Sequence, residues 1–316
     1  IFAIALLSGP VSANDLSMTA VKDTLASIPG EHNYIYVRTP LGEDEEKNYD
    51  EITFYDGLGR ELDFAQSYGA DRAGAIMAHH HLIEYDSLGR KEKQWLSTNT
   101  SFSYMSPEDL KGGVLWDYHD AGKRSYLQTN YESSPLNRIT EQYGVGDAWG
   151  DHPARMEYLT NIPADSLRCS FYFIDDNDSL IRRGDYRSGE LQVTKATDED
   201  GKPTYTFVDK QGRTLLTRLG RGNQQADTYF VFDRFGRIRY VLPPMINDEI
   251  SAGNLDLYAY QYLYDSFGRC ISKKLPGCAA IGYVYDKADR VILSQNGNQS
   301  QKKELSLIHI SEPTRP

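Results

Sequence analysis

The chain has 316 residues and a formal net charge of −11. An acidic surface of this kind repels the phosphates of nucleic acids and of anionic membranes, which excludes both as partners. The 23 Tyr, 11 Phe and 26 Gly predict an all-β, mainly antiparallel fold with many tight turns, and no apolar run after the first residues reaches the 18 needed for a transmembrane segment.

The two ends are expected to lie outside the folded domain. Residues 1–13 are uncharged and mostly apolar, and Val11-Ser12-Ala13 fits a signal-peptidase cleavage site, which predicts a truncated signal peptide rather than a buried strand. We interpret residues 14–30 as a polar leader or linker. Residues 305–316 match the translation of a sequencing adaptor, and we interpret them as an artefact rather than a polar tail. The chain is then a fragment truncated at both ends.

Residues 31–304 are predicted to form one β-rich domain, because no linker divides them. Strands are expected at 33–39 and 50–55, with an acidic loop at 41–48 between them. The hexapeptide YDGLGR follows at 55–60, and close copies follow at 85–90 (YDSLGR) and 264–269 (YDSFGR). The chemistry of the hexapeptide predicts a hairpin turn. Asp accepts hydrogen bonds from backbone amides two residues on, Gly adopts positive φ, and Arg begins the returning strand.

Looser copies of this turn extend the pattern along the chain. Asp198–Gly201 lacks the arginine, and Asp289 replaces the glycine in the copy at 285–290. From 190 to 242 the spacing predicts a meander of strands. The predicted turn residues are structural rather than catalytic: Tyr55, Asp56, Gly59, Arg60, Tyr85, Asp86, Gly89, Arg90, Asp209, Gly212, Arg213, Asp233, Gly236, Arg237, Tyr264, Asp265, Gly268, Arg269, Tyr285, Asp286 and Arg290.

Between the hairpins, the sequence predicts a few other elements. Ser106 and Pro107 are typical of a helix start, so a short helix is expected over 106–112. Strands are expected at 138–143 and 155–160 within long loops. Residues 255–265 alternate strictly, which predicts a strand with Tyr258, Tyr260, Tyr262 and Tyr264 on one face. That face is expected to pack against neighbouring strands, and carbohydrate stacking is the alternative.

No group of residues predicts a catalytic, cofactor or metal site. His79, His80 and His81 are interpreted as a solvated strand entry, because adjacent strand residues point to opposite faces. The acidic run 175–179 lacks the glycine and glutamate of a calcium loop and is interpreted as an acidic turn. Cys169 and His152 lack the local sequence of a nucleophile and base. We expect no cofactor. A Cys270–Cys278 disulfide remains open, although Pro276-Gly277 is expected to turn Leu275 toward Cys278.

The repeated hexapeptides resemble the YD repeats of bacterial Rhs proteins, which animal teneurins share. Other stretches, including 33–39, 131–144, 227–244 and 273–290, resemble the domain of unknown function that often opens long exported Rhs proteins. The resemblance covers about 31 to 298. It implies β-hairpins that coil into a hollow shell, which in many members encloses a variable C-terminal toxin. The spacing of the repeats is irregular, so a twisted open sheet is expected rather than a strict solenoid.

Three functions follow from these observations. The first is a non-enzymatic scaffold at the N-terminus of an exported Rhs/YD-repeat protein. It would start or cap a β-shell, its partners would be downstream YD repeats and a C-terminal effector of the same chain, and its location would be periplasmic, cell-surface or secreted. The second is a cell-surface adhesin that binds glycans through tyrosines. The third is a hydrolase that uses an unrecognised pair of carboxylates.

Overall fold

The computed structural model describes residues 4–7, 28, 30, 32–40, 48–70, 76–119, 122–220, 225–246 and 248–307. Contacts between residues divide the chain into two compact units, Ile1–Arg155 and Met156–Pro316. The boundary falls inside strand β10 (Ala154–Thr160), so no linker marks it in the sequence. Both units consist mainly of antiparallel strands with few short helices, which confirms the all-β fold class.

The first unit begins with a sheet in which strands β2 to β5 follow one another in antiparallel order. Strand β1 pairs with β2 in parallel, and β7 pairs with the first half of β5. The strands span Ile4–Leu7 (β1), Asn33–Pro40 (β2), Asn48–Tyr55 (β3), Glu61–Ala70 (β4), Ile76–Tyr85 (β5) and Thr98–Ser101 (β7). The strands expected near 33–39 and 50–55 are therefore present.

The second half of β5 continues into another run of strands. It pairs with β6 (Lys91–Trp95), which pairs with β8 (Tyr126–Tyr131). Strands β9 (Ile139–Tyr143) and β10 follow, and the strands expected at 138–143 and 155–160 are thus confirmed. Because β5 pairs with different strands along its length, it joins both parts of the unit.

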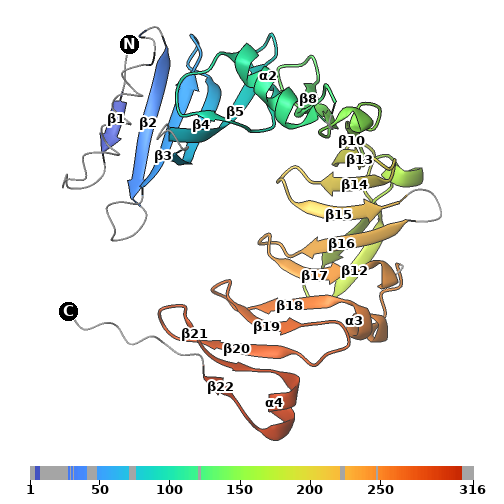
Figure 1. The fold of residues 1–316 in the computed structure, drawn as a ribbon. Coiled ribbons are helices and arrows are strands. Elements are labelled where there is room, and N and C mark those ends of the chain that lie inside the picture. The colour runs from blue at the N-terminus through green and yellow to red at the C-terminus, as the bar shows by residue number, and fades with distance from the viewer. Residues whose placement is uncertain are drawn as a thin grey trace, which may run out of the picture. The chain divides into compact units, whose positions relative to one another are not determined.

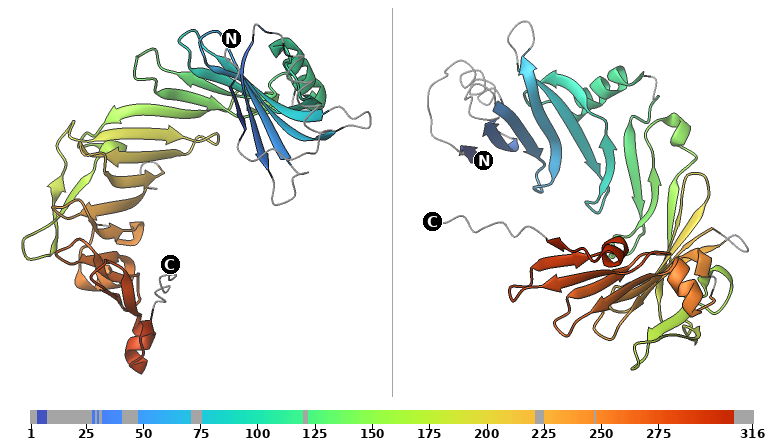
Figure 2. Two further views of the ribbon diagram at one scale, coloured as in Figure 1. Left: turned by 90° about the vertical axis from the view of Figure 1, so that its left-hand side faces the viewer. Right: turned by 90° about the horizontal axis from the view of Figure 1, so that it is seen from below.

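Apolar side chains from several strands form the core of the first unit. Ile52, Phe54, Ala65 and Ala78 are fully buried, and Phe102 packs against them. Helix α2 (Pro107–Asp117) lies against the sheet and contacts β5 and β7 (Figure 2). It buries Leu110 and Val114. It starts where the sequence predicts, with the Ser106 hydroxyl accepting a hydrogen bond from the Asp109 N–H, and it continues five residues further than expected.

The second unit is an antiparallel meander in which each strand from β13 to β22 pairs with the next (Figure 1). This confirms the meander expected from 190 to 242. The strands span Gln192–Thr197 (β13), Pro203–Val208 (β14), Thr214–Leu219 (β15), Ala226–Phe232 (β16), Ile238–Leu242 (β17), Tyr260–Tyr264 (β18), Cys270–Lys274 (β19), Ile281–Tyr285 (β20), Val291–Gln295 (β21) and Ser306–Leu307 (β22).

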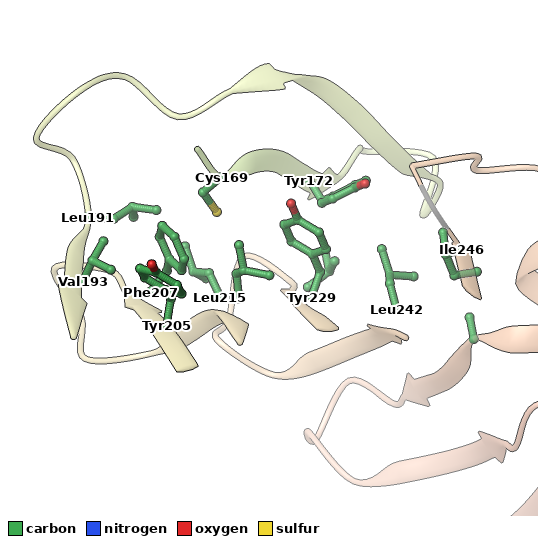
Figure 3. Packing of buried hydrophobic residues seen from close by; sticks show 13 residues of the cluster. Cys169, Tyr172, Leu191, Val193, Tyr205, Phe207, Leu215, Tyr229, Leu242 and Ile246 are labelled. Carbon is green, nitrogen blue, oxygen red and sulfur yellow. The ribbon is translucent and has the colours of Figure 1, made fainter. Parts of the chain in front are cut away.

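A separate hairpin covers part of this meander. Strands β11 (Ser170–Ile174) and β12 (Leu180–Asp185) pair only with each other among the described strands, and β11 contacts β16. Figure 3 shows Cys169 and Tyr172 facing Leu215, Tyr229 and other apolar side chains of the meander. Burying these side chains between hairpin and sheet removes apolar surface from water and stabilises the unit.

The interpretation of 255–265 as one strand is wrong. Residues Ala252–Tyr258 form helix α3, and β18 begins only at Tyr260. Ser251 caps the helix by accepting a hydrogen bond from the Asn254 N–H, and buried Ala259 ends it. Local capping therefore overrides the alternating pattern. Tyr258 does not share a strand face with the other three tyrosines, so the row of four does not exist.

The remaining helices are short. They are α4 (Gly297–Lys302) and the 3-10 turns η2 (Asp147–Trp149), η3 (Asp165–Leu167) and η4 (Pro244–Ile246). None of the helices in the described ranges is long and apolar enough to cross a bilayer.

The ends of the chain are only partly described. Residues 4–7 form β1, and Ser306–Leu307 form β22. The rest of the expected signal peptide, most of the expected leader, the acidic loop at 41–47 and residues 308–316 lie outside the described residues.

Candidate functional site: the Asp–Arg turns

The six turns with an Asp–Arg pair share one hydrogen-bond pattern. In the first, the Asp56 N–H donates to the Arg60 carbonyl at 2.9 Å, and the Gly59 N–H donates to the Asp56 carbonyl at 3.0 Å. Asp56 Oδ1 accepts from the N–H groups of Leu58 and Arg60, each at 2.9 Å. Asp56 Oδ2 accepts from Arg60 Nε at 2.7 Å. One carboxylate therefore holds both the turn backbone and the arginine side chain.

The same bonds recur in the other five turns. The backbone pair and the Asp–Arg contact are present at 86–90, 209–213, 233–237, 265–269 and 286–290. The fourth turn residue has positive φ in every case, 75° at Gly59 and 60° at Asp289 for example. Glycine avoids the steric cost of that conformation, and Asp tolerates it better than most residues.

These contacts shift the pKa values of the aspartates. Burial alone would raise the pKa of Asp233, but hydrogen bonds from the Arg237 backbone and guanidinium outweigh it and hold the pKa below its usual value. The pKa values of Asp56, Asp86, Asp209 and Asp265 are lowered by the same balance. At Asp286 the hydrogen bond from the Arg290 N–H is the largest cause. The turns therefore contain ionised, fully engaged carboxylates at neutral pH.

In five of the six turns the arginine also reaches an aromatic residue of a neighbouring strand; for Arg290, among the described residues, no such ring contact is present. The guanidinium carbon of Arg60 lies 4.5 Å from the centre of the Tyr85 ring, and that of Arg237 lies 4.8 Å from the Tyr264 ring. Equivalent contacts join Arg90 to Tyr131, Arg213 to Phe232 and Arg269 to Tyr285. Cation–π attraction thus links each of these five hairpins to the next strand that pairs with it.

Hydrogen bonds reinforce these links in both directions. Arg90 Nη1 donates to the Glu132 carbonyl at 2.9 Å, while the Tyr131 hydroxyl donates to the Lys91 carbonyl at 3.0 Å. The Tyr85 and Tyr285 hydroxyls likewise donate to the carbonyls of Glu61 and Cys270, the residues that follow Arg60 and Arg269. We call the contact between a turn arginine and the ring of the neighbouring strand the Arg–aromatic link; in most cases carbonyl hydrogen bonds accompany it.

The Arg–aromatic links of the second unit lie along one edge of its meander. Figure 1 shows the turns after β14, β16, β18 and β20 at the same end of the strands. Arg237 lies between Phe235 of its own turn, at 4.9 Å, and Tyr264 of the next hairpin. Arg269 lies in the same way between Phe267, at 5.0 Å, and Tyr285. The arginines are therefore inner parts of the fold rather than free cations.

One link rests on a turn that the sequence analysis missed. Glu132 replaces the aspartate, and its carboxylate accepts from Arg138 Nε and Nη2 at 2.7 Å each. Asn137 takes the positive-φ position, at 54°. The pKa of Glu132 falls to about 2, mainly because of the Arg138 side chain and then the Ser134 hydroxyl. The signal is the Tyr-Glu pair of 131–132, hidden by two extra residues before the arginine.

Two further turns keep the aspartate without the arginine. Asp198 accepts from the Lys202 N–H, and Gly201 has a φ of 78°. Asp175 Oδ1 accepts from the N–H groups of Asn177 and Ser179, with Asp178 at a φ of 65°. The acidic run that resembles a calcium loop is thus an Asp turn between β11 and β12. Across the described residues, no group of three or more His, Cys, Asp or Glu is arranged to hold a metal ion.

The interpretation of His79–His81 as a solvated strand entry is wrong. The three residues lie inside β5, and His80 is only 1% exposed. His80 Nδ1 lies 2.7 Å from Asp63 Oδ2, and Nε2 lies 3.0 Å from the Ser101 carbonyl oxygen. Strands β4 and β7 pair with β5 on either side of His80. The run of histidines by itself does not reveal these neighbouring strands.

The three cysteines are free thiols. The Cys278 N–H donates to the Leu275 carbonyl at 3.1 Å, so Leu275 and not Cys270 lies across the turn from Cys278. Burial raises the pKa of Cys169 to about 12. Its thiol is therefore protonated at neutral pH, which does not suit a nucleophile.

Two cavities of the second unit are large enough for a ligand. One of about 980 Å³ is lined by Leu159, Ile162 and Leu167 and by the Lys195–Glu157 ion pair. Another, of about 690 Å³, lies between the Asp175, Asp233 and Asp265 turns. Those three carboxylates accept turn hydrogen bonds, and Asp178 forms an ion pair with Arg239 at 2.7 Å. The carboxylates of Asp175, Asp178, Asp233 and Asp265 at this cavity are thus engaged in turn hydrogen bonds and an ion pair.

Comparison with known proteins finds one matching family and several solved structures with a similar fold. The family described as Domain of unknown function (DUF6443) matches residues 33–160. No curated protein matches the chain. The crystal structure of TcdB2-TccC3-Cdc42 is similar at a TM-score of 0.54 and 15% identity over 84% of this chain. That of TcdB2-TccC3 without its hypervariable C-terminal region has a TM-score of 0.54 and 14% identity over 89% of this chain. The chain spans 12% and 13% of the length of those chains.

Proposed function

We propose that this chain is a non-enzymatic scaffold segment at the N-terminus of an exported Rhs/YD-repeat protein. Its hairpins start or cap a β-shell that carries a C-terminal effector of the same chain, and the protein acts in the periplasm, at the cell surface or after secretion. The series of Arg–aromatic links carries this proposal, because it is a means of adding hairpin after hairpin rather than of binding or transforming a substrate.

The hydrogen bonds of the turn aspartates and arginines support a structural role. The Asp233 carboxylate accepts from two backbone N–H groups and from the Arg237 guanidinium, and Arg237 also bonds the Asp265 carbonyl. The Asp233 carboxylate is therefore held in its ionised form by the turn, which does not suit a general acid or base, and Arg237 is held between two hairpins. The family match over 33–160 and the fold similarity to TcdB2-TccC3 chains agree with this role.

The adhesin alternative loses the surface on which it depends. It requires Tyr258, Tyr260, Tyr262 and Tyr264 to form one row, and Tyr258 lies on helix α3. Of the other three, Tyr264 is covered by Arg237. Glycan binding is therefore the weaker proposal.

The uninterrupted gene downstream of Glu304 provides the test. We expect further Tyr/Phe-Asp-x-x-Gly-Arg repeats in the reading frame, followed by a variable C-terminal domain. A stop codon soon after codon 304, without further repeats, contradicts the proposal.

A further inference from the structure

A cavity lined mainly by aromatic residues lies between the β11–β12 hairpin and the meander, and we call it the aromatic cavity. Its volume is about 240 Å³, and seven of its thirteen lining residues are aromatic. The Phe171 ring contacts those of Phe173 and Tyr186, with ring centres 5.6 and 4.8 Å apart. Tyr172 and Tyr229, whose ring centres lie 4.8 Å apart (Figure 3), also line the cavity. Such a wall favours a ligand that is itself a flat ring.

The aromatic cavity lies beside the cavity of about 690 Å³ between the Asp175, Asp233 and Asp265 turns. The two share Ile174, Asp233 and Arg234 as lining residues. Sites for drug-sized ligands measure about 300–1,000 Å³, so the smaller aromatic cavity suits a molecule with a single ring. The polar part of such a molecule then lies at the junction of the two cavities, beside Arg234.

The charge at the aromatic cavity is unbalanced at one residue. Of the charged residues that line it, Arg213 pairs with Asp209 at 2.6 Å, and Asp233 pairs with Arg237 at 2.7 Å. Arg234 forms no ion pair or side-chain hydrogen bond within the part of the chain that the structure describes, and its guanidinium carbon lies 4.9 Å from a ring centre of its own turn. The remaining positive charge favours an anionic ligand.

Acidic side chains of the larger cavity restrict the charge of that ligand. Asp178 is paired with Arg239 at 2.7 Å, whereas Asp175 and Asp176 have no cationic partner among the described residues. Their negative charge repels a ligand with two or more negative charges more strongly than a ligand with one. The junction therefore favours a monoanion.

We propose that the aromatic cavity binds a small aromatic monocarboxylate. The ring lies among the aromatic side chains, and the carboxylate accepts hydrogen bonds from the Arg234 guanidinium, whose planar shape matches a carboxylate through two parallel N–H groups. This site is independent of the proposed function, because its residues are present whether or not further repeats follow in the chain.

Binding of 3-(4-fluorophenyl)propanoate to the full chain, followed by fluorine NMR titration, tests the proposal. We expect a Kd of about 1 mM or below, as one buried ring and one ion pair provide for a ligand of this size. The amide of the same acid lacks the charge, and propanoate, measured by competition, lacks the ring. Each should bind at least about tenfold more weakly.

Two variants of the full chain locate the site. Arg234→Gln should weaken binding of the acid about tenfold, because it removes the charge. Lys210→Gln is the matched control, because exposed Lys210 follows Asp209 as Arg234 follows Asp233 and lines neither cavity. Its Kd should equal that of the unchanged chain. The comparison of acid with amide uses the unchanged chain and needs no variant to fold.

Tighter binding of the acid than of the amide, weakened by Arg234→Gln and not by Lys210→Gln, supports the site. Equal Kd values for acid and amide overturn it. Equal weakening by both substitutions also overturns it, because the acid is then attracted by surface charge in general. A lack of binding at ten times the expected Kd has the same consequence. The gene downstream of Glu304 tests the proposed function separately.

Discussion

At the scale of the residue, each position of the turn has one physical task. The aspartate carboxylate accepts hydrogen bonds from backbone N–H groups of the turn and from the arginine. The arginine contacts the ring of the neighbouring strand, and the fourth residue has positive φ, which allows the chain to reverse. The two glycines of the first turn separate these tasks. Gly59 has a φ of 75°, Gly57 has no such constraint, and a Cβ atom would meet no neighbour at either position.

We expect Gly59→Ala to lower the free energy of unfolding by about 1–2 kcal/mol, because an L-residue at positive φ is strained. The matched control Gly57→Ala should be neutral or stabilising by about 0.4–1 kcal/mol, because alanine restricts the unfolded chain. Urea denaturation followed by circular dichroism measures both. Equal changes in the free energy of unfolding for the two substitutions would show that positive φ does not restrict the residue at position 59.

The buried pair of His80 and Asp63 provides a second prediction at this scale. Their side chains are 0% and 2% exposed, so each depends on the other for a polar partner. Asp63→Leu should lower the free energy of unfolding by about 3 kcal/mol, because it leaves the buried Nδ1 of His80 without its partner. The double variant Asp63→Leu/His80→Phe should recover most of that loss. A double-mutant cycle from urea denaturation measures the coupling energy of the two side chains. If the losses of the two single variants simply add in the double variant, the two side chains are not coupled.

At the scale of the element, the hairpin and its Arg–aromatic link form the repeating unit. Antiparallel pairing sets the register, and the register places five of the six turn arginines opposite a ring. The turn and the ring contact are separable features. The copy at 198–202 turns without an arginine, and the turn at 132–138 keeps its link although two extra residues interrupt its pattern.

Acid should weaken all six turns together. Their aspartates have lower pKa values in the folded chain than in the unfolded chain, so they stabilise the fold fully above the unfolded value of about 3.9. That stabilisation is lost as the pH falls through the lower, folded-state values. We therefore expect the free energy of unfolding to be nearly constant from about pH 7 to 5 and to fall below about pH 4.

The variant Asp233→Asn identifies the contribution of one turn. It should be less stable at neutral pH, because the ion pair with Arg237 is gone, and should lose less stability than the unchanged chain between about pH 5 and 3. Urea denaturation at several pH values measures both slopes. An identical pH dependence in the two proteins would mean that the turns do not carry the effect.

At the scale of the whole molecule, two compact units each have their own core. The thiols report on the second unit. Exposed Cys278 should react with Ellman's reagent within seconds at neutral pH, whereas Cys169, 1% exposed and with a pKa of about 12, should react only on unfolding. Because Cys270 is partly exposed, both proteins carry Cys270→Ser, and in that background Cys278→Ser should abolish the fast phase and leave the slow phase of Cys169 intact. A fast phase that survives this substitution would contradict the buried position of Cys169.

The sequence by itself determined the fold class, the meander and the helix start at Ser106, because turn, strand and cap preferences act over a few neighbouring residues. The positions of the Asp turns follow from the same local chemistry. Only the tertiary structure decided which ring each arginine meets, because β6 and β8 pair across an intervening strand and helix. It also placed His80 in the interior and Tyr258 on a helix, and it joined Glu132 to Arg138. Burial and long-range pairing depend on strands distant in the chain, and an alternating or charged pattern does not encode them.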